Sequence, residues 1–175
     1  HNKRSPFAAL YSSLGCPFRC SFCMINSINR NTNSPLYTAA DSAAFRYWSS
    51  ERTLREIVIL ALQGVSNIRF ADEMFFLKPS HYAPLLEGIK KEFGDSLNLW
   101  AYARVDTVKP IQLPLFRAAG VRWLALGIES ANQVIRREVC KGSYEEVDVR
   151  QIVKEIEGAG IEVVANYIIA LPGDT

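Results

Sequence analysis

The sequence is 175 residues long, which is enough for one domain with a sizeable hydrophobic core. Its 20 basic and 18 acidic residues leave a formal net charge of +2, so nothing in the charge indicates a nucleic-acid or membrane-surface partner. The most apolar stretches, residues 57–62 and 161–171, are short or interrupted by polar residues, so neither is expected to span a bilayer.

The first expected strand, residues 7–13, leads into a loop that holds three of the four cysteines within eight positions. Cys16, Cys20 and Cys23 follow a C-x3-C-x2-C spacing. Soft thiolates this close together indicate a metal or iron–sulfur site. A [4Fe–4S] cluster held by protein alone needs four cysteines, so three on one loop would leave one iron open to bind a small molecule. Clustered free thiols also suit a reducing compartment, and we expect a cytoplasmic protein.

Other uses of these cysteines stay open at this point. A structural zinc site needs four ligands, and Cys140 or His81 would have to supply a distant fourth. A disulfide framework fits poorly, because the short loops would strain the bridges and the cluster holds an odd number of thiols. Ordinary buried cysteines are not normally grouped in this way. By itself, Cys140 is expected to be an inert buried thiol, and His81 a surface residue.

The rest of the chain alternates between expected helices and strands, the signature of βαβ units and of an all-parallel sheet. Periodicity leaves both a doubly wound sheet and a barrel open. Residues 24–48 show little periodicity and predict either a lid or substrate loop or a surface insertion. The expected helices cover 51–63 (capped by Ser49 or Ser50), 80–93 (capped by Ser80), 110–119, 132–139 and 144–159 (with Ser143 and Glu146 as a capping box), and the later strands cover 67–71, 97–105, 121–128 and 161–171.

Polar residues stand at the carboxyl ends of these strands, where parallel α/β proteins collect their active sites. Each has a simpler use as well: a solvated turn for the acidic pair after the second strand, an ion pair with Asp106 for Arg104, and a helix cap for the pair after the fourth strand. Met74, Phe75 and Phe76 are expected mainly to pack. The candidates are Asp72 and Glu73, Arg104 and Asp106, Glu129 and Ser130, and Asn166.

Four segments together resemble the radical SAM superfamily, and within it the subgroup that usually carries an N-terminal cobalamin-binding domain. They are the cysteine motif with Phe22 before its last cysteine, Ala71-Asp72-Glu73-Met74-Phe75, Gly127-Ile128-Glu129-Ser130 and Leu171-Pro172-Gly173-Asp174-Thr175. The resemblance implies a partial (β/α)6 TIM-like barrel with about five βα units present and the sixth beyond Thr175. We therefore expect residues 1–175 to be a radical SAM core domain, truncated at both ends.

The resemblance also implies the cofactors and their contacts. Cys16, Cys20 and Cys23 would hold a [4Fe–4S] cluster whose open iron is chelated by S-adenosylmethionine. The family's Gly-Gly-Glu segment is Ala-Asp-Glu here, so either Asp72 or Glu73 would contact the ammonium of S-adenosylmethionine. Arg104 would meet its carboxylate, Glu129 and Ser130 its ribose, and Phe22 with the segment from Asn166 to Ala170 its adenine.

The implied function is reductive cleavage of S-adenosylmethionine to a 5′-deoxyadenosyl radical that abstracts a substrate hydrogen, in the service of cobalamin-dependent methylation or rearrangement. It requires an external electron donor, such as a flavodoxin or ferredoxin, and a small-molecule or peptide substrate. Cobalamin would bind through a domain outside this chain. A different class of function stays open, a non-catalytic iron–sulfur module for electron transfer or redox sensing, as does a zinc-stabilised binding domain.

Overall fold

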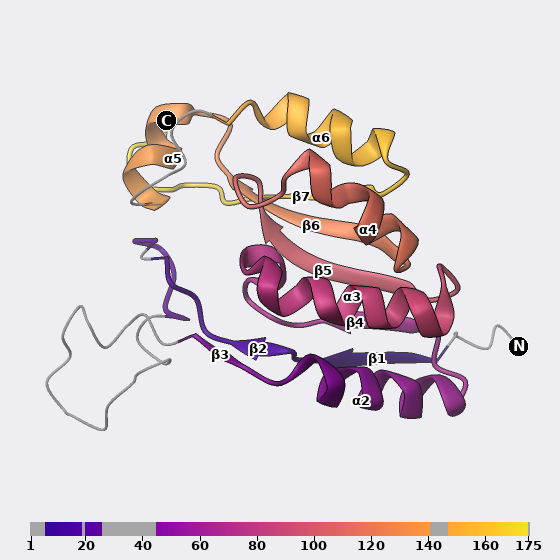
Figure 1. Ribbon diagram of the computed structural model, residues 1–175. Coiled ribbons are helices and arrows are strands. Elements are labelled where there is room, and N and C mark those ends of the chain that lie inside the picture. The colour runs from indigo at the N-terminus through magenta and orange to yellow at the C-terminus, as the bar shows by residue number, and fades with distance from the viewer. Residues whose placement is uncertain (1–5, 19, 26–44, 141–146, 175) are drawn as a thin grey trace, which may run out of the picture.

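The computed structural model describes residues 6–18, 20–25, 45–140 and 147–174. Five strands form one sheet in the order β1-β4-β5-β6-β7, and every neighbouring pair is parallel (Figure 1). The chain is thus an α/β structure, and the predicted parallel sheet is confirmed. Its strands are β1 (Phe7–Leu10), β4 (Asn67–Phe70), β5 (Asn98–Arg104), β6 (Val121–Glu129) and β7 (Glu162–Tyr167).

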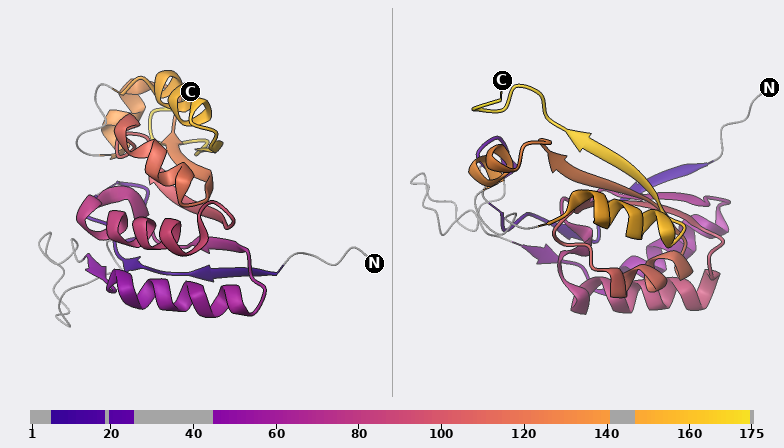
Figure 2. Two further views of the ribbon diagram at one scale, coloured as in Figure 1. Left: turned by 45° about the vertical axis from the view of Figure 1, so that its right-hand side comes forward. Right: turned by 90° about the horizontal axis from the view of Figure 1, so that it is seen from above.

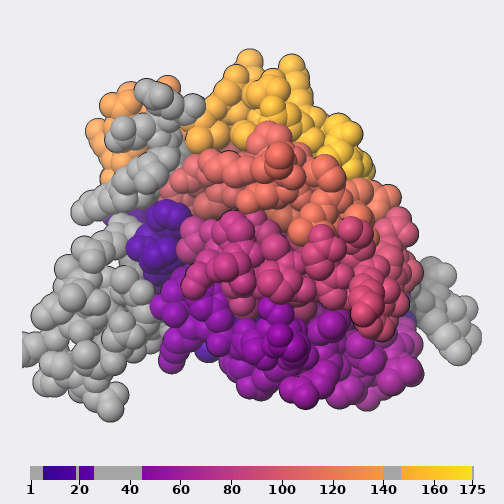
Figure 3. Space-filling view, viewed as in Figure 1, coloured from indigo at the N-terminus to yellow at the C-terminus, as the bar shows by residue number. Residues whose placement is uncertain are grey.

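The long helices lie on one face of this sheet, as Figures 1 and 2 show. In the space-filling view of Figure 3 they cover that face in bands that follow the order of the strands. A doubly wound sheet would carry helices on both faces, whereas helices on one face are the arrangement of a barrel. The helices are α2 (Ser50–Leu62), α3 (Pro79–Phe93), α4 (Leu113–Ala118) and α6 (Val149–Gly158), with α5 (Gln133–Cys140) at the carboxyl end of the sheet and short 3₁₀ turns η1 (Phe75–Leu77) and η2 (Pro110–Gln112).

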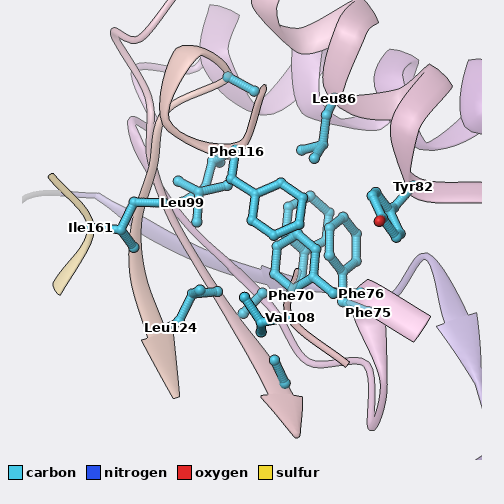
Figure 4. Packing of buried hydrophobic residues seen from close by; sticks show 14 of the residues in the cluster. Phe70, Phe75, Phe76, Tyr82, Leu86, Leu99, Val108, Phe116, Leu124 and Ile161 are labelled. Carbon is cyan, nitrogen blue, oxygen red and sulfur yellow. The ribbon is translucent and has the colours of Figure 1, made fainter. Parts of the chain in front are cut away.

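Aromatic side chains fill the space between the sheet and these helices (Figure 4). The rings of Phe76 and Phe116 lie 4.1 Å apart between centroids, those of Phe70 and Phe75 4.2 Å apart, and Tyr82 packs edge-on against Phe76. All five side chains are almost completely buried, and such pairs add to the free energy gained from the buried area. The expectation that Phe75 and Phe76 serve packing is confirmed.

The first strand is shorter than predicted, because the chain leaves the sheet at Tyr11. The backbone N–H of Ser12 donates to the carboxylate of Asp72, at 3.0 and 3.1 Å, instead of continuing the ladder with β4. The next residues form β2 (Ser13–Leu14), which pairs antiparallel with β3 (Arg46–Tyr47). The sequence shows no signal for β3, which lies at the end of the segment 24–48. The predicted lid or insertion falls mostly on 26–44, outside the described residues.

Two helix starts differ from the prediction, while Ser49 caps α2 as expected by accepting from the N–H of Arg52. Helix α3 begins at Pro79 after Lys78, so the predicted Ser80 cap is wrong; proline is favoured at a first position, where its missing N–H costs nothing. Helix α6 begins at Val149, capped by Asp148. The predicted capping box of Ser143 and Glu146 lies outside the described residues.

Strand β7 also ends early, at Tyr167, because the N–H of Ile168 donates to the carbonyl of Glu129 and Ala170 adopts a left-handed φ of 63°. In the part of the chain that the structure describes, every helix is too short or too polar to cross a membrane.

Candidate active site

A cavity of about 360 Å³ lies at the carboxyl ends of the strands, next to the loop that carries the cysteines. Its walls come from that loop and from the ends of β4, β5, β6 and β7, so segments 150 residues apart meet there. All the predicted site residues except Asp106 and Ser130 line it. They are Cys16, Cys20, Phe22, Cys23, Asp72, Glu73, Arg104, Glu129 and Asn166.

The cysteine loop, residues 15–25, is held to the rest of the structure at two points, Gly15 and Ser21. Gly15 adopts φ 102°, a region open to glycine, and its N–H donates to the carboxylate of Glu73 at 3.1 Å. Further along the loop, the N–H of Ser21 donates to the carbonyl of Val139 in α5, at 2.8 Å. Beyond Ser21, the Cys23 N–H donates to the Cys20 carbonyl at 3.1 Å. The loop thus has a defined position between the β4 end and α5.

The three thiols lie close enough to influence one another, and none is in a disulfide. The pKa of the Cys16 thiol is raised to about 11, mainly by burial, with a smaller contribution from the neighbouring Cys20 and Cys23; a hydrogen bond with the Phe18 backbone and the cation of Arg104 act in the opposite direction. The Cys16 thiol therefore does not ionise readily on its own in this site, because it is poorly solvated. A bound metal centre deprotonates a coordinating thiol outright and supplies the missing positive charge.

The two adjacent acidic residues after β4 have different surroundings. Asp72 is completely buried, and its carboxylate accepts hydrogen bonds from Ser12 N–H, from Ser12 Oγ at 2.7 Å and from Ser13 Oγ at 2.5 Å. Glu73 is half-buried and faces the cavity beside Gly15. The carboxylate of Asp72 is therefore occupied in holding the segment that leads into the cysteine loop, and Glu73 is the one directed to the cavity.

His81 belongs to the same buried group, so the prediction of a surface residue is wrong. Its side chain is 7% exposed; Nε2 lies 3.1 Å from Ser12 Oγ, and the ring packs on Tyr47 at 4.3 Å between centroids. Burial lowers the pKa of His81, and Lys78 adds to this, while Asp72 acts in the opposite direction. Sequence reasoning missed this role because Ser12 and His81 are 69 positions apart and meet only in the fold.

Arg104 is buried in the cavity wall, where its guanidinium makes a two-point ion pair with Asp106. The Nε–Oδ1 and Nη2–Oδ2 distances are 2.9 and 2.8 Å. The flat side of the guanidinium lies over the ring of Phe18, with Cζ 3.7 Å from the ring centroid. The simpler use that the sequence left open, the pair with Asp106, is thus formed, and Phe18 is a site residue that sequence reasoning missed.

The segment after β6 divides its two polar residues between different tasks. Ser130 Oγ accepts from the N–H of Asn132 at 3.0 Å, so it organises the turn before α5. Glu129 has a left-handed φ of 67°, which turns its side chain back over the strand. A Cβ at Gly127 would lie 2.6 Å from Glu129 Oε1, so any other residue at this position would require the Glu129 carboxylate to move. Ser130 lines a neighbouring cavity with Glu129 and Tyr167.

The model of the Radical SAM superfamily matches residues 10–175, a match that includes the cysteine motif and every strand end described above. This chain belongs to the radical SAM superfamily.

Curated relatives match nearly the whole chain. An uncharacterized methyltransferase from Pyrococcus horikoshii is 29% identical over 171 residues, 97% of this chain and 34% of that protein. A hopanoid C-2 methylase from Rhodopseudomonas palustris is 28% identical over 171 residues, 94% of this chain and 30% of that protein. The chain therefore spans about a third of the length of these relatives.

The solved structure of the radical S-adenosylmethionine methyltransferase TsrM from Kitasatospora setae, with cobalamin and a [4Fe-4S] cluster bound, superposes with a TM-score of 0.80. The two chains are 20% identical, and the match covers 98% of this chain and 32% of TsrM. This likeness confirms the predicted barrel-like radical SAM fold.

The donor set of this radical SAM chain fits an iron–sulfur cluster better than a single metal ion. Among the described residues, no three histidine, cysteine or carboxylate side chains come close enough together to bind one ion. In a [4Fe–4S] cluster each cysteine binds a separate iron, so the thiols are spaced more widely than the ligands of zinc. Three cysteines that line one cavity without converging on a point match that requirement.

Proposed function

We propose that this chain is the catalytic core of a radical SAM enzyme that reductively cleaves S-adenosylmethionine. Cys16, Cys20 and Cys23 would hold a [4Fe–4S] cluster, and the cavity beside them would hold S-adenosylmethionine. The observation that carries the proposal is the cavity itself, in which three thiols meet carboxylate and amide side chains from separate strand ends. When bound, the cluster supplies the electron that splits the sulfonium bond and yields a 5′-deoxyadenosyl radical.

The chain's own residues bind and orient the cofactor in this proposal. Glu73, fixed by the Gly15 N–H, accepts from the ammonium of S-adenosylmethionine, because Asp72 is already satisfied by Ser12 and Ser13. Glu129 accepts from the ribose hydroxyls, with Ser130 holding the turn beside it. Phe22 and Asn166, both at the cavity wall, pack on the adenine.

In this proposal Arg104 is the cationic group near the carboxylate of S-adenosylmethionine. Its ion pair with Asp106 restricts the direction in which the guanidinium can point. Its positive charge acts on both Cys16 and Glu129, since it lowers the pKa of each. An arginine anchored at two points by a carboxylate is fixed in direction and does not swing to follow a ligand. We therefore expect Arg104 to contribute charge and rigidity more than a flexible clamp.

Methyl transfer with cobalamin is the reaction that we propose for the whole protein. The support is the printed function of its relatives, a methyltransferase, a methylase and a structure of TsrM with cobalamin bound. Cobalamin would be held by a domain outside residues 1–175, which we propose as the radical SAM core domain. A flavodoxin or ferredoxin would supply the electron.

The competing function is an electron-transfer module without catalysis. It requires a fourth protein ligand to the cluster and no carboxylates around an open iron. The polar wall formed by Glu73, Glu129 and Asn166 supports the catalytic function, since a closed electron-transfer cluster has no use for it.

The deciding experiment is electron paramagnetic resonance of the anaerobically reconstituted, dithionite-reduced full-length protein, with and without S-adenosylmethionine. We expect a reduced [4Fe–4S] signal that shifts when S-adenosylmethionine is added. In Glu73→Gln the same cluster signal should remain, with the shift requiring about tenfold more S-adenosylmethionine, because one charge-assisted hydrogen bond is lost. A cluster signal indifferent to S-adenosylmethionine would establish the electron-transfer module, and stoichiometric zinc without iron would refute both.

Ionisation of the Glu129 carboxyl should make the binding of S-adenosylmethionine depend on pH. Burial raises the pKa of Glu129, an effect that the nearby Arg104 cation only partly offsets. The ionised carboxylate is the stronger acceptor for ribose hydroxyls, so affinity for S-adenosylmethionine should fall as the pH drops through this raised pKa. For folding the sign is opposite: ionisation of Glu129 costs stability, so its contribution is present at low pH and lost as the pH rises.

The measurement is the dissociation constant of S-adenosylmethionine between mildly acidic and neutral pH, for the wild type and Glu129→Gln. The variant should bind about tenfold more weakly at neutral pH, with little pH dependence of its own. An unchanged pH dependence in Glu129→Gln would assign the titration to another group.

A further inference from the structure

One row of side chains crosses the whole sheet on the face opposite the helices, called here the inner face. Successive strand partners, from β1 to β7, make up this row, and partners in parallel strands point to the same side. The core residues Ile68 and Phe70 point to the helices, so Arg69 between them points to the inner face. The row consists of Ala9, Arg69, Trp100, Trp123 and Glu162.

The row lies directly below the active-site cavity. The next row towards the carboxyl ends contains Tyr102, Ala125 and Val164, and the one beyond it Arg104, Gly127 and Asn166. Five of these six residues line the cavity beside the cysteines. The inner face therefore continues without a break from the proposed S-adenosylmethionine site to Trp100 and Trp123.

Arg69 is the unusual member of this row. Its guanidinium carbon lies 4.3 Å from the ring centroid of Trp100 and 5.0 Å from that of Tyr102, and its Nη2 donates to the Tyr102 hydroxyl. Its Nε is buried without a hydrogen-bond partner, and no carboxylate of the described residues lies within 4.0 Å of the guanidinium. Within the described part of the chain the cation is thus held by aromatic rings and a hydroxyl, with no negative charge beside it.

A half-buried cation without a counter-ion is costly, and proteins normally pair it. Arg104, two rows above, is paired with Asp106. Branched aliphatic side chains usually pack the interior of a closed barrel, whereas the inner face here carries the aromatic residues Phe7, Trp100 and Trp123. These three residues line a second cavity of about 330 Å³ on the inner face. The guanidinium of Arg69 packs on Trp100, which lines this second cavity, and on Tyr102, which lines the active-site cavity. Aromatic rings beside such a cation have the chemistry of a binding site for an aromatic anion.

We propose that the inner face is the substrate site, where a flat, apolar substrate stacks on Trp100 and Trp123 and places a carboxylate or phosphate on Arg69. The proposal rests on the proposed function, because it names the substrate class of the same site. Adjacent rows are about 7 Å apart along the strands. Arg69 lies two rows below the cavity rim and reaches up to Tyr102, so the anionic group would be on the order of 10 Å from the reacting carbon.

The test uses two probes of nearly equal size, the anion 2-naphthylacetate and the uncharged 2-naphthylacetamide. Calorimetry would measure their binding to the full-length, cluster-loaded protein with S-adenosylmethionine present. We expect the acid to bind at least about tenfold more tightly than the amide, since it gains a charge-assisted hydrogen bond. Arg69→Met should remove this preference, and Arg69→Lys should keep part of it because the charge remains.

The matched control is Arg52→Met, which removes an exposed arginine of α2 that pairs with Glu56 far from the cavity; it should leave the preference unchanged. Equal binding of the two probes, no binding of either, or a preference that survives in Arg69→Met would overturn the proposal. Circular dichroism of Arg69→Met and Arg69→Lys checks that both fold.

The spectrum of the cluster separates this proposal from the proposed function. Arg69→Met should keep the signal shift caused by S-adenosylmethionine, because Arg69 lies below the cofactor cavity. If the wild type showed no such shift, the proposed function would fail, while the comparison of acid and amide would still decide the role of Arg69.

Discussion

Cys20→Ala in the full-length protein is expected to abolish cluster binding and S-adenosylmethionine cleavage while leaving most of the barrel folded. Cys20 is half-buried and packs at the edge of a small apolar cluster with Val139 and Leu171. Its loop is still held by the Ser21–Val139 and Gly15–Glu73 hydrogen bonds. Loss of one such thiol should cost about 1 kcal/mol of the free energy of unfolding, whereas loss of a ligand removes the cluster itself.

Iron and acid-labile sulfide content, the visible absorbance of the cluster and the formation of 5′-deoxyadenosine measure this result. The matched control is Cys140→Ala, which removes the one cysteine outside the motif. It should keep full iron content and activity. Loss of the cluster in Cys140→Ala would mean that a fourth protein ligand exists, and the three-cysteine assignment would be wrong.

Asp72→Ala is expected to destabilise the fold strongly, in contrast to a change at its neighbour Glu73. It would leave the Ser12 N–H and the Ser12 and Ser13 hydroxyls buried without their acceptor. Each abandoned buried donor costs about 1–3 kcal/mol, so we expect a loss of at least about 3 kcal/mol. The segment that leads into the cysteine loop would also lose its attachment to β4, so cluster loading should fall as well.

Chemical denaturation measures the free energy of unfolding, and thermal unfolding should show a decrease in Tm of roughly 6–12 °C for a domain of this size. Asp72→Asn keeps one acceptor oxygen and should fall between the wild type and Asp72→Ala. The control Glu73→Gln should change stability by less than about 1 kcal/mol and weaken S-adenosylmethionine binding instead. If Asp72→Ala were stable but failed to bind S-adenosylmethionine, the roles of the two carboxylates would be exchanged.

Much of the fold was predictable because its signals are local. The apolar runs of β4, β5 and β6 and the glycines after the helices mark the βα units within a few residues of their observed ends. The errors occur where a distant partner competes with a local preference. Ser12 belongs to an apolar run that reads as strand, yet its N–H bonds to Asp72, 60 positions away, and the strand ends there.

The candidate site was predictable to a similar degree. The cysteine spacing is a local pattern, and in parallel sheets the residues at strand ends collect at one edge, so the sequence named nearly all the polar lining of the cavity. It missed Phe18 and Tyr102. Tyr102 lies two positions before Arg104, and since side chains alternate between the two faces of a strand, the sequence could have predicted that both residues lie on the same face of β5.

By itself, the sequence determined the family, the parallel sheet and the three cysteines, because each follows from short motifs or from the order of locally encoded helices and strands. Only the tertiary structure decided what the charged side chains do. It buried Asp72 and His81 around Ser12, turned Glu73 to the cavity and paired Arg104 with Asp106. It also placed Arg69 on the inner face with no carboxylate partner among the residues that the structure describes. The reason is physical: the role of a charge depends on its neighbours and on its access to water, and both come from segments that are far apart in the chain.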